Sequence, residues 1–129
     1  MNIIWSRREQ QQVKDKELMK ECLKTIYKAL DDKKAEDIQI IDIHEVSYMA
    51  DYFVIANGTN INQVHALCDN VSEEMAKLKM LTKQTEGYTS GNWVLMDYGD
   101  IIIHIFDKES RSYYDLERIW KDGTIVELD

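Results

Sequence analysis

Two aspartates inside an apolar segment come closest to forming a catalytic pair. Asp97 and Asp100 lie three positions apart. With Asp51 or Asp42 they could hold metal ions for phosphoryl or nucleotidyl transfer. Such sites commonly place two carboxylates at i and i+2 on one strand face, whereas a spacing of i, i+3 across Gly99 fixes no common direction. We therefore predict that the pair begins and ends a turn, the commoner use of aspartate.

Gly58 and Thr59 are a second candidate, because backbone N–H groups after a strand can bind a phosphate at a helix N-terminus. The segment lacks the GxGxxG spacing and the GK[ST] ending of nucleotide-binding loops. An ordinary strand-to-helix turn explains it at least as well. With Asp97 and Asp100, these residues define an alternative function, a small nucleotidyl or phosphoryl transferase.

The histidines and cysteines form no metal or nucleophile motif. His44, His65 and His104 have no HxH or HExxH spacing, and for His104 a core or boundary position with a hydrogen bond is favoured. Cys22 and Cys68 lack CxxC spacing and fall on predicted helices, which indicates two buried, reduced thiols. We predict no enzyme, no metal site and no cofactor.

The composition is that of one acidic globular domain. The 129 residues carry a net charge of −8, which disfavours direct nucleic-acid binding and favours a basic protein partner, such as a ribosomal protein or a histone. No apolar run approaches the ~20 residues of a membrane span, and no signal peptide is evident. A cytoplasmic protein is expected.

Hydrophobic periodicity predicts alternating helices and strands. Asn60 and Gln63 resemble a capping box that opens the second helix. The order predicts an α/β fold, a single domain with a mixed β-sheet flanked by helices. The expected elements are a helix over 14–33, strands over 37–43 and 51–57, a helix over 60–78, a short edge strand near 82–86, a hairpin over 93–106 and a final helix over 107–122 that Gly123 ends.

Three segments are expected along the chain: an N-terminal extension over 1–14, the domain over 15–122 and a C-terminal tail over 123–129. The extension is polar after Trp5 and could be flexible, a cloning remnant or a first helical turn. The chain has no proline, which excludes a proline-rich linker.

Aromatic residues are concentrated around the hairpin and the last helix. Each one alone is more often part of a core, because large rings bury most area. Together with neighbouring acidic residues they favour a protein-interaction face, since Trp, Tyr and Arg anchor interfaces. They are Trp93, Tyr98, Tyr113, Tyr114 and Trp120.

Three blocks of the sequence, over 50–59, 93–106 and 110–120, closely resemble the ribosomal silencing factor family, also called Iojap-related. The resemblance covers about residues 17–122. It implies a fold similar to nucleotidyltransferase domains without their catalytic carboxylates. It also implies a cytoplasmic factor that binds large-subunit ribosomal protein fourteen (L14), sterically blocks joining of the small subunit and represses translation when nutrients are short.

The resemblance further implies a partner-binding site. Trp93 and Tyr98 would be aromatic anchors, and the acidic residues would face Lys or Arg of the partner. It also implies a homodimer off the ribosome through an overlapping surface. The net charge and the lack of a long apolar run separately predict little direct nucleic-acid contact and no membrane contact. An adaptor for another basic protein is a third possibility. The residues that match the family's motif are Trp93, Asp97, Tyr98, Asp100, Tyr114 and Glu117.

Overall fold

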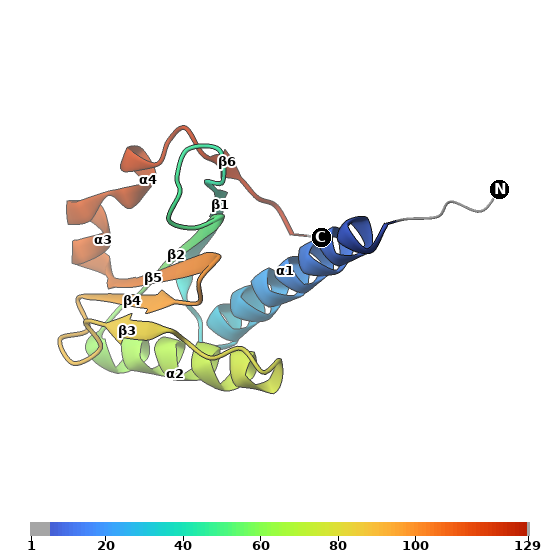
Figure 1. The fold of residues 1–129 in the computed structure, drawn as a ribbon. Helices are drawn as coiled ribbons and strands as arrows, with labels where there is room; N and C mark the ends of the chain where they lie inside the picture. The colour runs from blue at the N-terminus through green and yellow to red at the C-terminus, as the bar shows by residue number, and fades with distance from the viewer. Residues whose placement is uncertain (1–5, 129) are drawn as a thin grey trace.

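A six-stranded mixed sheet forms the centre of the molecule, and the computed structural model describes residues 6–128 (Figure 1). The strand order is β3-β4-β5-β2-β1-β6, and only the β2–β5 pair is parallel. This confirms the predicted single α/β domain with a mixed sheet flanked by helices. The elements are α1 (Arg7–Asp32), β1 (Glu36–Asp42), β2 (Tyr52–Gly58), α2 (Ile61–Lys77), β3 (Gln84–Glu86), β4 (Trp93–Asp97), β5 (Ile101–Asp107), α3 (Lys108–Tyr114), α4 (Leu116–Ile119) and β6 (Thr124–Ile125).

Helix α1 begins seven residues before the predicted start at residue 14. Ser6 caps it by accepting a hydrogen bond of 3.1 Å from the Glu9 N–H. Every side chain over 7–18 is exposed, so no apolar stripe marks this part of the helix in the sequence. Figure 1 shows α1 extending past the sheet. Trp5 lies outside the described residues.

The capping interaction at α2 differs in one detail from the predicted box. Asn60 Oδ1 accepts the Gln63 N–H at 2.9 Å, as expected. The Gln63 Oε1 atom accepts from the Thr59 N–H at 2.6 Å and from the Thr59 hydroxyl at 2.9 Å, instead of from the Asn60 N–H. The Thr59 amide that could have bound a phosphate is therefore already used.

The β4–β5 hairpin has the predicted turn. Gly99 has a φ of +90°, a conformation that a side chain would disfavour. Asp97 Oδ1 accepts the Gly99 N–H at 2.7 Å, and the Tyr98 N–H donates to the Ile101 carbonyl at 2.9 Å. Asp97 thus begins a turn that Asp100 ends, which confirms their structural role.

The C-terminal region corrects the single helix predicted over 107–122. Asp115 adopts a left-handed conformation with φ of +48°, which separates α3 from α4. Tyr113 is 83% exposed and Ile119 is 65% exposed, whereas Leu116 is 7% exposed, so these side chains do not share one buried helix face. The chain then leaves α4, and residues 124 and 125 add the unpredicted strand β6 beside β1.

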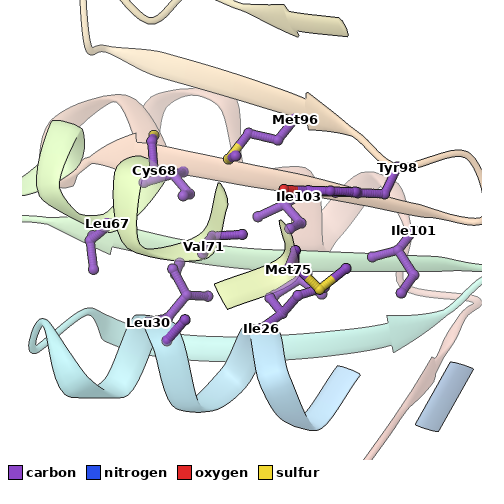
Figure 2. Close-up of a cluster of buried hydrophobic side chains, with 14 of the residues drawn as sticks. Ile26, Leu30, Leu67, Cys68, Val71, Met75, Met96, Tyr98, Ile101 and Ile103 are labelled. Carbon is purple, nitrogen blue, oxygen red and sulfur yellow. The ribbon is translucent and has the colours of Figure 1, made fainter. Parts of the chain in front are cut away.

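The two sheet faces carry separate apolar clusters. On one face α1 and α2 cover the larger cluster (Figure 2), and on the other Leu116 and Trp120 pack over Phe53 and Phe106. Cys22 and Cys68 are buried and unbonded, as predicted, and Cys68 lies in the larger cluster. Among residues 6–128, no helix has the length and apolarity to cross a membrane.

Candidate partner-binding face

An aromatic surface lies on the sheet face opposite α1 and α2, where β4 meets α3. Trp93 and Leu95 alternate along β4 with the buried Val94, so both point to this face. The Trp93 ring lies 4.6 Å from that of Tyr114, and Tyr113 packs edge-on against Tyr114 at 5.2 Å. Tyr113 is 83% and Tyr114 43% exposed. We call Trp93, Leu95, Tyr113 and Tyr114 the aromatic face.

A hydrogen bond to the buried His104 fixes the orientation of the Trp93 ring. The Trp93 indole N–H donates to His104 Nδ1 at 3.0 Å, which assigns the imidazole proton to Nε2. His104 is buried, as expected of a core histidine, and burial lowers its pKa to about 4. It is therefore neutral at pH 7. The edge-on Phe53 ring, 4.6 Å away, restricts the imidazole further.

The buried imidazole should make folding stability depend on pH. His104 has a lower pKa in the folded chain, about 4, than its ordinary value of 6.5. The unfolded chain therefore binds the proton first, and this group reduces stability as pH falls from 6.5 towards 4. Between about pH 7 and 5 the expected loss is about 2 kcal/mol.

Urea unfolding at both pH values measures this loss. His104→Phe should lose far less stability over that interval than the unsubstituted chain. His44→Gln is the control, because hydrogen bonding to Asp42 raises the pKa of His44 and its contribution has the opposite sign. An unchanged pH dependence in His104→Phe would contradict the assignment.

A mostly buried arginine joins α3 to the sheet. Arg111 Nε pairs with Glu117 Oε1 at 2.8 Å, and Nη1 donates to Asn57 Oδ1 at 2.9 Å and to the Glu36 carbonyl at 3.2 Å. The Arg111 side chain is only 12% exposed. These bonds join both short helices to β1 and β2, so they set the position of the two tyrosines. Glu117, which we expected to face a basic partner, is already paired within the chain.

Two carboxylates other than Glu117 lie on the same side of the sheet as the aromatic face. Asp97 is on the same side of β4 as Trp93, four residues along, which is about 13 Å. Glu86 pairs with Leu95 in the antiparallel register and so shares its side of the sheet. Glu86 is exposed and was not among the predicted residues, because a three-residue edge strand leaves little pattern in the sequence.

Tyr98 corrects the expectation of a second exposed anchor. It is 7% exposed and lies among Met96, Ile101 and Ile103 on the helix-covered face (Figure 2). Burial raises the pKa of its hydroxyl, which bonds to Ser72. Strand alternation, continued one residue past Asp97, could have indicated this side.

The six predicted residues are therefore only partly brought together. Trp93, at the start of β4, lies beside Tyr114 and Glu117 at one end of the face. Asp97 lies at the other end of β4. Asp100 is exposed at the turn and lines a groove on the far side with Tyr98. Exposed apolar side chains that no sequence pattern indicated include Val46, Tyr48, Met49 and Ile119.

The chain matches a family model described as "Ribosomal silencing factor during starvation" over residues 16–129. Ribosomal silencing factor RsfS of Bacillus subtilis is 40% identical over 110 residues, covering 85% of this chain and 93% of that protein. The chain belongs to the ribosomal silencing factor family. Protein Iojap, chloroplastic, of Zea mays is 32% identical over 114 residues, covering 84% of this chain and 48% of that protein.

Solved structures agree with this assignment. A crystal structure from Bacillus halodurans is similar with a TM-score of 0.75 and 36% identity, covering 84% of this chain and 98% of that one. Another, from Chromobacterium violaceum, has a TM-score of 0.76 and 33% identity, covering 78% and 84%.

The family is regulatory and non-enzymatic, which confirms that the chain is not an enzyme. The transferase alternative also lacks its chemistry. Asp97 bonds to its own turn, and the Thr59 amide bonds to Gln63. Over residues 6–128 no group of three His, Cys, Asp or Glu side chains is placed to hold a metal ion.

Proposed function

We propose that this ribosomal silencing factor binds L14 of the large ribosomal subunit with its aromatic face and blocks joining of the small subunit. Translation is thereby repressed when nutrients are limiting, in stationary phase, in the cytoplasm. Support comes from family membership and from the exposed rings of the face, with Trp93 held in place by the hydrogen bond to His104. That half-buried indole, held by a hydrogen bond, is the observation that carries the proposal.

The chemistry of the face suits a basic ribosomal protein. Held aromatic side chains lose little conformational entropy on binding and anchor interfaces well. The carboxylates of Asp97 and Glu86 flank them, and the net charge of −8 favours encounter with a basic partner. The same charge disfavours direct binding to ribosomal RNA. Trp93, Leu95, Tyr113 and Tyr114 would therefore contact L14, with the two carboxylates facing its cations.

Steric blocking predicts a dependence on the order of addition. The protein added to separated large subunits before small subunits should suppress cell-free translation strongly. The same amount added to ribosomes with cross-linked subunits should have little effect, because no joining step remains to be blocked. Luciferase synthesis in the two reactions measures this. Equal inhibition in both would show that the protein acts on a later step.

A homodimer off the ribosome is part of the proposal. A dimer that used the aromatic face would compete with L14, as the family resemblance implies.

A further inference from the structure

A groove of about 880 Å³ lies on the helix-covered side of the sheet, away from the aromatic face. Its walls are residues 15–23 of α1, the strand ends near the hairpin turn and the C-terminal residues 126–128. The volume is within the range of sites that hold a drug-sized molecule or a few residues of a peptide. Apolar side chains from all three walls line the groove, among them Leu18, Met19, Ile101 and Val126.

Acidic side chains also line each of these walls. Asp15 is on α1 and Glu127 is in the C-terminal segment, whereas Asp42, Asp51 and Asp100 are at the strand ends. These five carboxylates outnumber the two lysines that line the groove, so its potential is negative. The lysines, Lys16 and Lys20, are both on α1, so the negative potential is strongest at the strand ends.

The carboxylates of Asp51 and Asp100 are the ones most available to a ligand. The two residues lie side by side, because the N–H groups of Asp51 and Tyr52 both donate to the Asp100 carbonyl, at 2.9 and 3.0 Å. Neither carboxylate has an ion-pair partner within residues 6–128, whereas Asp42 already bonds to His44. Burial and the Asp42 and Asp51 carboxylates raise the pKa of Tyr52, so a neutral ring lies in the groove beside the acids.

A ligand that complements this groove carries cations and apolar groups at short intervals. A guanidinium group suits the strand ends, since it pairs with carboxylates in a bidentate geometry and also stacks on an aromatic ring such as Tyr52. A compact cation would leave the apolar lining in contact with water, and a purely apolar ligand would leave the carboxylates unused.

The length of the groove suits a short piece of extended chain. Residues 15–23 of α1 form its long wall, which is about 12 Å of helix. About four residues of an extended peptide cover that distance. Carboxylates on walls that face one another allow a peptide to place a cation at each side of a central apolar side chain.

We propose that the groove binds a short, extended, basic segment of a partner protein, in which arginines alternate with apolar residues. One arginine of the segment pairs with Asp51 and Asp100 over the Tyr52 ring, and its apolar side chains pack on Leu18 and Ile101. The groove and the aromatic face are on opposite sides of the sheet, so the segment can bind while L14 is bound. The inference therefore does not rest on the proposed function.

Labelled synthetic peptides test the proposed chemistry. A peptide of about seven residues, with arginine alternating with leucine, spans the groove. Its fluorescence anisotropy should rise to saturation on titration with the full chain at physiological salt concentration. Matched peptides with glycine in place of leucine, or glutamine in place of arginine, should each bind about tenfold more weakly or less tightly still. The proposal is overturned if the arginine–leucine peptide fails to bind, or if the glycine peptide binds as tightly.

Variants of the full chain test whether the peptide occupies the groove. Asp51→Asn/Asp100→Asn should weaken binding about tenfold or more, since it removes the two unpaired carboxylates. The control Glu73→Gln/Asp122→Asn removes two exposed carboxylates outside the groove and should change affinity by less than about twofold. Leu18→Gln, at a 44% exposed position of α1, keeps a good helix former and should weaken binding about fivefold. Equal weakening by the control would mean that net charge alone attracts the peptide, which overturns the proposal.

Amide NMR spectra of the full chain with the arginine–leucine peptide locate the contact. The signals of Asp51, Tyr52 and Asp100 should shift, and those of Tyr113 and Tyr114 should not. Shifts confined to the two tyrosines of α3 would place the peptide on the aromatic face and overturn the proposal. Spermidine, a polyamine without side chains, should displace the peptide only at a large excess. Displacement at equal concentration would make the groove a polyamine site, which also overturns the proposal.

Discussion

Replacing Trp93 by alanine should weaken binding to L14 by about 30-fold or more, a loss typical of a central aromatic anchor. The substitution removes the half-buried ring that packs against Tyr114 and the N–H that His104 accepts. Isothermal titration with purified L14 measures the change. The affinity of Trp93→Phe for L14 should lie between those of the unsubstituted chain and Trp93→Ala. Phenylalanine keeps a ring at this position but cannot make the hydrogen bond that orients it.

Two tyrosines of matched exposure provide the control. Tyr114 on the aromatic face is 43% exposed, and Tyr27 on α1 is 40% exposed. Tyr114→Ala should reduce affinity for L14, whereas Tyr27→Ala should not, although both remove a similar area. Circular dichroism must show that the variants stay folded. If Tyr27→Ala weakens binding as much as Tyr114→Ala does, the aromatic face is not the binding surface.

Replacing Arg111 by methionine should lower the free energy of unfolding by about 2–3 kcal/mol, because it leaves a partly buried Glu117 without its cation. Asn57 and the Glu36 carbonyl also lose a donor. The change keeps the aliphatic part of the side chain and removes the bonds that fasten α3 to β1 and β2. Affinity for L14 should fall as well, since Tyr113 and Tyr114 lie on α3.

Urea denaturation of control variants distinguishes the contribution of the Arg111–Glu117 ion pair from that of general side-chain packing. Arg118→Met, at an exposed position of α4, should change stability by less than about 0.5 kcal/mol. The double variant Arg111→Met/Glu117→Gln should be less destabilised than the sum of its single variants, because the unpaired charge is gone. Strict additivity would mean that the ion pair at 2.8 Å contributes nothing to α3.

Most of the sheet and α2 were predictable because burial leaves a pattern in their sequences. The pattern is a helical period in α2, an alternation in β4 and a continuous apolar run in β2 and β5, which are covered on both faces. The Asn60 cap, the Gly99 turn and the β5 run each have a local signal that matches the structure. The first half of α1 has no buried face, so its helix was missed from residue 7 to residue 13. Neither the left-handed Asp115 nor the two-residue β6 leaves a sequence pattern, because each depends on contacts with distant parts of the chain.

The residues that we propose for binding were predictable by type but not by orientation. Trp93 and Tyr114 lie together as expected, whereas Tyr98 turns into the core one residue after β4. Glu117 is a carboxylate at the predicted place, but Arg111 already neutralises it. No spacing in the sequence shows that partnership, because the bond depends on the break at Asp115. Glu86 reaches the face only through strand pairing with Leu95.

Site-specific photo-cross-linking tests most directly which surface touches which protein. Tyr113→p-benzoylphenylalanine places a photoreactive group at an 83% exposed position of the aromatic face, and Tyr27→p-benzoylphenylalanine places one on α1. After irradiation with isolated large subunits, mass spectrometry should identify L14 as the product from position 113 and not from position 27. Cross-linking of L14 from position 27 alone, or of another ribosomal protein from position 113, would contradict the account.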